Sequence, residues 1–127
     1  MSKHIIATEK APAALGPYSQ GVSATGEMIF VSGQIPIVPA TGEVVSGDIT
    51  AQTIQCMENI KAILAEAGAQ MSDIVKTTIY LKDMNDFATV NAAYGKYFEK
   101  DAPARGCVEV ARLPKDMQVE IEAIAVR

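Results

Sequence analysis

Residues 73–83, DIVKTTIYLKD, carry the clearest structural signal in the chain. Two sets of side chains alternate along this stretch: Val75, Thr77, Ile79 and Leu81 in one, Lys76, Thr78, Tyr80 and Lys82 in the other. Such alternation, rich in β-branched residues, predicts a β-strand, because successive side chains of a strand point to opposite faces of its sheet. We therefore expect one strand of a sheet over this stretch.

An amphipathic helix is expected on each side of this strand. The first runs from about residue 49 to 67, where Asp48 is a suitable N-cap and Gly68 a suitable stop. The second runs from about residue 86 to 98, and Asn91 interrupts its apolar stripe. The other members of that stripe are Phe87, Val90, Tyr94 and Phe98. Asn91 is therefore a candidate buried hydrogen-bonding residue, in the core or at a site.

The remaining strands are expected near the two ends of the chain. Alternating or apolar runs predict strands at residues 4–8, 18–25, 27–36, 104–111 and 118–127. The second and third are joined by a possible hairpin turn at Thr25-Gly26-Glu27, and the last two are expected to form an antiparallel hairpin.

The predicted order of elements is βββ-α-β-α-ββ, which indicates the α+β class. We expect a single domain over residues 1–127, in which two helices cover one face of a six-stranded mixed sheet. The other face would keep many apolar residues with no third helix to cover them. We therefore expect a second copy of the chain to bury that face.

Composition excludes several classes of protein. A net charge of −4 argues against nucleic acid as the main partner, because phosphate binding needs a basic surface. Two cysteines and one histidine leave neither a disulfide framework nor a plausible zinc site. The opening residues, MSKHIIATEK, lack the apolar run of a signal peptide, and no run approaches the length of a membrane helix. We expect a cytoplasmic protein.

The stretch ARGCVEVARLP, residues 104–114, has an unusual beginning for a core strand. Arg105 is always charged and suits a carboxylate ligand, although a structural ion pair with Glu120 or Glu122 would explain it equally well. Gly106 lets a ligand approach the backbone, or marks a bulge. Cys107 shares the face of Arg105, and we interpret it as a small buried thiol rather than a nucleophile, because no histidine lies near it in sequence.

Four further residues are candidates for a site. Glu120 lies in an apolar strand, where a half-buried carboxylate could move protons, although a solvated outer face is the simpler explanation. Tyr18 follows Gly-Pro at a loop exit and could form the wall of a pocket. Ser32 and Gly33 end a strand, where free amides can bind an anion.

Together these segments resemble the reactive-intermediate deaminase family, RidA subgroup, also called YjgF. The segments that carry the resemblance are APAALGPYSQG, VSGQIP, NDFATVN and PARGCVEVARLPKDMQVEIEAIAVR, spread over nearly the whole chain. The family implies a chorismate-mutase-like fold, a homotrimer with sites between subunits, and hydrolysis of 2-imino acids to 2-keto acids and ammonia. It implies no cofactor.

The resemblance also implies roles for individual residues. Arg105 would bind the substrate carboxylate, the amide of Cys107 would hold the imine or keto group, and Glu120 would orient or activate water. The pocket would be lined or supported by Tyr18, Ser32, Gly33, Asn91 and Gly106. The family usually has serine where this chain has Gly106, so a second layer of hydrogen bonds could be weaker here.

Two other functional hypotheses remain at this stage. The same pocket could belong to a non-catalytic module that binds 2-keto acids and regulates another protein. An RNA-cleaving activity has also been attributed to some members of the family. The acidic balance and the lack of a suitable histidine make RNA cleavage the weakest of the three hypotheses.

Overall fold

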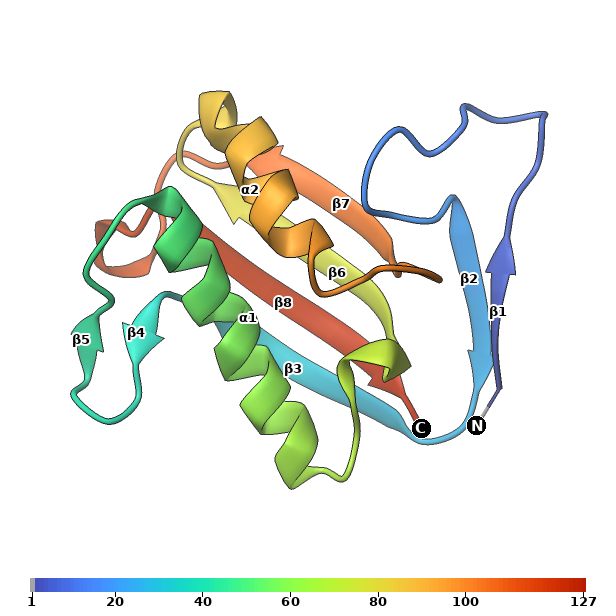
Figure 1. Ribbon diagram of the computed structural model, residues 1–127, viewed down its shortest axis with the longest axis horizontal. Coiled ribbons are helices and arrows are strands. Elements are labelled where there is room, and N and C mark those ends of the chain that lie inside the picture. Colours follow the sequence, from blue (N-terminus) through green and yellow to red (C-terminus); the bar gives the residue numbers. More distant parts are fainter. Residues whose placement is uncertain (1) are drawn as a thin grey trace.

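The computed structural model describes residues 2–127 and is built around a four-stranded sheet (Figure 1). The strands lie in the order β3 (Met28–Gln34), β8 (Val119–Val126), β6 (Ile74–Leu81) and β7 (Ala104–Glu109). The pairs β3–β8 and β8–β6 are antiparallel, and the pair β6–β7 is parallel. The predicted mixed sheet and α+β class are therefore confirmed.

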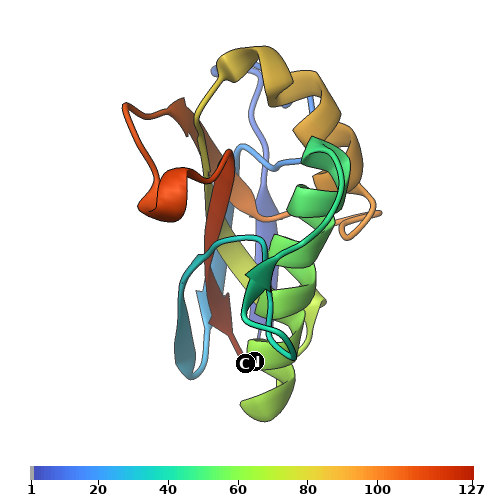
Figure 2. The same cartoon turned by 90° about the vertical axis from the view of Figure 1, so that its left-hand side faces the viewer.

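Both helices pack on one face of this sheet, as expected (Figure 2). Helix α1 (Ile49–Glu66) has Asp48 as its N-cap, and the Asp48 carboxylate accepts a hydrogen bond from the Ala51 amide at 3.0 Å. Helix α2 (Phe87–Gly95) ends earlier than the sequence predicts. Its continuation forms tighter turns, in which the amides of the two residues that follow Lys96 each bond the carbonyl three residues back.

The first two strands lie outside the central sheet, so the prediction of one six-stranded sheet is wrong. Strand β1 (Ser2–Ile6) pairs with β2 (Gly21–Thr25) as a separate antiparallel ribbon. The expected hairpin between β2 and β3 is absent because the chain changes partner at the turn. Gly26 has a φ of 143°, and from Glu27 onward the backbone pairs with the C-terminal strand, beginning with two hydrogen bonds to Arg127.

Several short elements complete the chain. The turn-rich segment before α1 contains a small ribbon of β4 (Ile37–Val38) and β5 (Glu43–Val44), which the sequence pattern did not indicate. Single 3-10 turns lie at Met71–Asp73, Met84–Asp86 and Pro114–Asp116.

The predicted antiparallel hairpin of the last two strands is also wrong. Strand β7 follows β6 and α2 as a crossover unit, and such a connection leaves the two strands parallel. Strand β8 then returns to the other side of β6 and lies between β6 and β3. The edges of the sheet are therefore β3 and β7.

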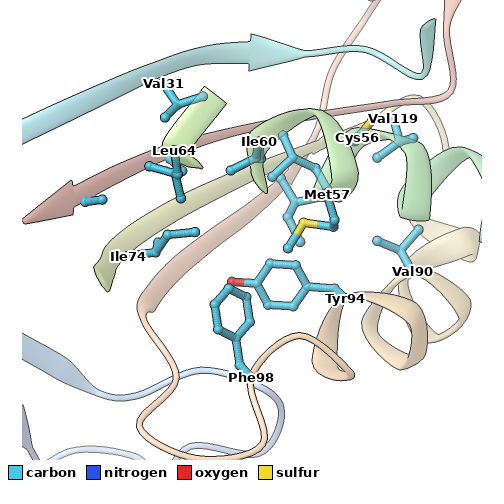
Figure 3. Packing of buried hydrophobic residues seen from close by; sticks show 14 of the residues in the cluster. Val31, Cys56, Met57, Ile60, Leu64, Ile74, Val90, Tyr94, Phe98 and Val119 are labelled. Carbon is cyan, nitrogen blue, oxygen red and sulfur yellow. The ribbon is translucent and has the colours of Figure 1, made fainter. Parts of the chain in front are cut away.

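The core lies between the sheet and the two helices (Figure 3). Met57 and Ile60 of α1 and Tyr94 of α2 are all fully buried there. The Tyr94 hydroxyl lies 2.7 Å from Thr77 Oγ1 of β6, so the buried phenol has a polar partner. This hydrogen bond joins α2 to the centre of the sheet.

The face of the sheet opposite the helices is not covered by the chain. Alternation places Met28, Phe30 and Val108 on it, and these side chains are 56%, 68% and 45% exposed. An exposed apolar surface of this kind on a sheet is typical of a protein–protein contact. Within residues 2–127, neither helix has the length and hydropathy that crossing a bilayer requires.

We expect Asn59→Ala to destabilise the protein by about 1–3 kcal/mol, because it removes a buried amide that bonds two backbone carbonyls. Asn59 Nδ2 donates to the carbonyls of Ile35 and Ile37, at 3.3 and 3.0 Å, and so holds the segment from the end of β3 to the start of β4 against α1. Urea unfolding measures the loss. Gln55→Ala is the matched control, because the Gln55 side chain donates to Asn59 Oδ1 and not to the two backbone carbonyls. This substitution should lower the free energy of unfolding by less than about 1 kcal/mol. Equal losses in the two variants would contradict this role of Asn59.

Candidate active site

Arg105 and Cys107 both face the helices. In the parallel ladder Arg105 lies opposite Thr77 and Cys107 lies opposite Ile79, and both β6 residues are fully buried beneath α1 and α2. Because paired residues of neighbouring strands share a face, the prediction that Arg105 and Cys107 point the same way is confirmed. Strand β7 lies at the edge of the sheet, so these residues are also close to its rim.

The guanidinium of Arg105 is held by a neutral amide and three aromatic rings. Its Nη1 donates to Asn91 Oδ1 at 2.6 Å, which gives Asn91 a polar role at the site. Its Cζ lies 5.3 Å from the ring centroid of Tyr18, 5.6 Å from that of Phe87 and 5.3 Å from that of Tyr94. We call these three rings the aromatic cage. A cation over an aromatic face gains about 0.5–2 kcal/mol per ring.

Arg105 has no carboxylate partner among residues 2–127. The salt bridge found in that part of the chain joins Arg112 to Asp116. An ion pair of Arg105 with Glu120 or Glu122, one of the two explanations that the sequence left open, is therefore wrong within one chain. One of the N–H groups of this guanidinium donates to a neutral oxygen. The positive charge is therefore not neutralised, and the other N–H groups can donate to a ligand.

Glu120 lies on the opposite face of the sheet. It pairs with Tyr80, on the face that the helices do not cover, and its side chain is half-buried. Its neighbour on β3 is Gly33, in an irregular stretch of the β3–β8 ladder. A Cβ atom at Gly33 would collide with the Glu120 carboxylate, so the glycine makes room for that group. Ser32, which precedes it, is exposed.

The predicted site residues therefore form two groups. Arg105, Asn91 and Tyr18 meet on the helix side of β7, where Cys107 also faces, whereas Glu120 and Gly33 meet at the junction of β8 and β3. In one chain, the two groups therefore lie toward opposite edges of the sheet and on its opposite faces. A hollow of about 640 Å³ beside β1 has Tyr18 in its lining but neither Arg105 nor Glu120.

The Tyr18 loop is hydrogen-bonded to the two residues that precede β7. The Ser19 hydroxyl donates to the carbonyl of Ala102 at 2.5 Å, and the Ser19 amide donates to that of Pro103 at 3.1 Å. These two bonds place Tyr18 beside Arg105, although the residues are far apart in sequence. The expectation that Tyr18 forms a wall of the site agrees with this position.

Cys107 has the properties of a protonated thiol. Burial raises its pKa, and the nearby positive charge of Arg105 opposes this only in part. A Cβ atom at Gly106 would have no heavy atom within 4 Å, so a serine fits at this position of the chain. Among residues 2–127, no three His, Cys, Asp or Glu side chains gather in a way that would hold a metal ion.

Sequence reasoning missed two residues of this site, Phe87 and Tyr94. Both were assigned to the apolar stripe of the second helix, and both also contact the guanidinium. Their spacing from Asn91, four residues before and three after, places all three side chains on one face of α2. That shared face was the signal available in the sequence.

Comparison with known proteins identifies the family. The family model described as Endoribonuclease L-PSP matches residues 8–127. The chain belongs to this family. A 2-iminobutanoate/2-iminopropanoate deaminase of Escherichia coli K12 is 62% identical over 130 residues, which cover 100% of this chain and 99% of that protein. A RutC family protein of Pyrococcus abyssi is 60% identical over 125 residues, with 98% of each chain covered. The resemblance to the RidA subgroup is thereby confirmed.

Solved structures of the L-PSP family have the same fold. The E. coli YjgF gene product is 60% identical with a TM-score of 0.75, and E. coli TdcF with bound serine is 50% identical with a TM-score of 0.76. Each alignment covers 98% of both chains. The likeness to these two structures therefore extends over nearly the whole chain.

We expect the Cys107 thiol to react slowly at neutral pH, because its pKa is raised and little thiolate forms there. The reaction rate with a disulfide reagent should increase steeply as the pH rises above the ordinary thiol range, without reaching a plateau near pH 8. Absorbance of the released aromatic thiol measures it. The Cys107→Ala protein is the control, since the other thiol, Cys56, is fully buried and burial raises its pKa to about 12. A rate that is already maximal at pH 7 would contradict this reading.

Proposed function

We propose that this protein hydrolyses 2-imino acids, such as 2-iminobutanoate and 2-iminopropanoate, to the corresponding 2-keto acids and ammonia. The observation that carries the proposal is the guanidinium of Arg105, a residue of the edge strand β7 that has no carboxylate partner among residues 2–127. Its charge and planar donors suit the carboxylate that every 2-imino acid carries. The 62% identity with the E. coli deaminase supports the same assignment.

The reaction needs only binding groups and a positioned water. An imine carbon is electrophilic, so water adds to it and forms a tetrahedral carbon that bears both hydroxyl and amino groups. Loss of ammonia from that carbon gives the keto group, and the net change is one water consumed and one ammonia released. Proximity and fixed dipoles can supply most of the acceleration for such a step.

Three of the candidate residues have direct roles in this scheme. Arg105 binds the carboxylate, and the backbone amide of Cys107 donates to the imine nitrogen or the keto oxygen. Glu120 accepts a proton from the attacking water and can return it to the departing nitrogen. The thiol of Cys107 has no part in the reaction, in agreement with its raised pKa.

A complete site requires two subunits under this proposal. Arg105 and Glu120 lie on opposite faces of one sheet, so a single chain cannot present both to one small substrate. We propose a homotrimer in which the uncovered sheet faces pack together and each cleft combines Arg105 of one subunit with Glu120 of the next. The exposed Met28, Phe30 and Val108 support this assembly. We also propose that the protein acts in the cytoplasm, where it removes reactive imines as a form of metabolite repair.

RNA cleavage is a weaker candidate, although the description of the family includes an endoribonuclease. His4, the only histidine in the sequence, lies exposed on β1, in a different sheet from Arg105 and Glu120. The net charge of −4 also disfavours a polyanion. RNA degradation that persists in Arg105→Ala and Glu120→Ala proteins would indicate a contaminating nuclease.

The first test is imine loss. Threonine dehydratase generates 2-iminobutanoate, and quenching with semicarbazide measures how much remains over time. We expect the protein to accelerate the loss, and Arg105→Ala to reduce kcat/KM at least about 100-fold, because it removes charge-assisted hydrogen bonds to the carboxylate. Cys107→Ala should stay within about threefold of wild type, because the backbone amide remains.

Two results would contradict this assignment. Imine loss no faster than in buffer would exclude the deaminase activity. If the protein then still bound a 2-keto acid saturably, the non-catalytic module would be favoured. A folded Cys107→Ala protein without activity would show that the thiol, and not only the amide, takes part.

The second test is subunit complementation. Arg105→Ala and Glu120→Ala chains should each be inactive alone, and their co-expression should restore activity, since about a quarter of the sites in randomly mixed assemblies keep both residues. Imine loss measures the recovery, and light scattering should give about three times the chain mass of 13.5 kDa. A double Arg105→Ala, Glu120→Ala chain mixed with wild type is the control. No recovery in assemblies shown to be mixed would contradict a site built from two subunits.

A further inference from the structure

Two side chains that contact Arg105 come from α2 and have no assigned role in the reaction. Phe87, at the first residue of the helix, and Tyr94, two turns later, each place a ring near the guanidinium carbon, at 5.6 and 5.3 Å. Phe87 is half-buried, whereas Tyr94 is fully buried. Together with Tyr18 they surround the cation with aromatic surface.

Aromatic rings differ from carboxylates in what they do to a cation. A ring face attracts the charge through its quadrupole and fixes the position of the guanidinium, but it adds no negative charge. A carboxylate would attract the charge more strongly and would also occupy the donors that a substrate needs. The hydrogen-bonding partner of Arg105, the Asn91 amide oxygen, is neutral as well. Within residues 2–127, the amide oxygen and the three rings therefore hold the cation without neutralising it.

The position of the Tyr94 ring is itself tightly determined. Its hydroxyl lies 2.7 Å from Thr77 Oγ1, and Thr77 is the residue directly opposite Arg105 in the β6–β7 ladder. The ring of Phe98 packs against it with centroids 5.0 Å apart (Figure 3). Burial raises the pKa of the Tyr94 phenol to about 12, so no phenolate forms beside Arg105 at neutral pH.

We infer that Phe87 and Tyr94 are positioning residues, which orient the Arg105 guanidinium and keep its charge available for the carboxylate of the substrate. The inference rests on the proposed function in taking a 2-imino or 2-keto acid as the ligand. The aromatic cage then acts through Arg105 and contributes to the affinity for the ligand, not to the chemical step. Binding and turnover should therefore respond differently to changes in these rings.

The principal experiment measures binding of 2-oxobutanoate, a stable 2-keto acid, by calorimetry. Phe87→Leu keeps apolar bulk but removes the ring, and we expect the Kd to rise about three- to tenfold. Phe87→Tyr keeps the ring and should bind within about twofold of wild type. With 2-iminobutanoate, Phe87→Leu should raise KM by a similar factor and leave kcat within about twofold.

A second arm tests the charge itself. Asn91→Asp has nearly the same shape and keeps an oxygen near Nη1, but it places a carboxylate beside the guanidinium. We expect this variant to weaken 2-oxobutanoate binding at least about tenfold, because the new ion pair competes with the ligand. Thermal unfolding should show that the variant remains folded. Tyr94→Phe should lower Tm through loss of the Thr77 hydrogen bond and change Kd less than Phe87→Leu does, since the ring remains.

The outcomes separate this inference from the proposed function. If wild type binds 2-oxobutanoate but does not accelerate imine loss, and Phe87→Leu weakens that binding, the deaminase assignment fails and the inference stands. An unchanged Kd in Phe87→Leu overturns the inference even when wild type is an active deaminase, and so does an unchanged Kd in Asn91→Asp. It is also overturned if wild type binds no 2-keto acid, if Phe87→Tyr binds as weakly as Phe87→Leu, or if the loss appears only in kcat.

Discussion

Arg105 faces α2 because β7 pairs with β6 in parallel, with Thr77 opposite Arg105. The crossover through α2 that creates this pairing also places the helix directly over the arginine, so its Asn91 and two of its rings contact the guanidinium. An antiparallel pairing of β7 with β8 would have separated the arginine from this helix. The electrostatic character of the site, a half-buried cation without a carboxylate partner in the described chain, thus follows from how one edge strand is paired.

The second consequence of the sheet is the separation of the two halves of the site. Strand β8 lies between β3 and β6, and its alternation sends Ile121 to the core and Glu120 to the uncovered face. Gly33 of β3 then provides the space for the Glu120 carboxylate. The apolar surface that the chain leaves uncovered and the distribution of the candidate residues both favour an assembly of several copies. The same architecture therefore connects the proposed chemistry to oligomerisation.

Local elements could be predicted well because local interactions specify them. Asp48 caps α1 as expected, and the alternation at residues 73–83 corresponds to β6. Pairing could not be predicted in the same way. The sequence pattern of 118–127 is compatible with any neighbour, and the turn at Gly26 suggested a hairpin that the pairing of Glu27 with Arg127 prevents. Arg105, Asn91 and Tyr18 were identified as candidates from residue type and resemblance, but their contact with one another, and the part played by Phe87 and Tyr94, required the fold.

The sequence by itself determined the class of the fold, the two amphipathic helices, the family and the residues that could carry the chemistry. These depend on side-chain periodicity, capping and short motifs, which act over a few residues along the chain. The tertiary structure decided which strands are neighbours and that Glu120 lies on the opposite face. It also decided that Arg105 has aromatic partners and, among residues 2–127, no carboxylate partner. These are contacts between residues distant in sequence, such as Tyr18 with Arg105. They depend on the packing of all elements together, which no local pattern specifies.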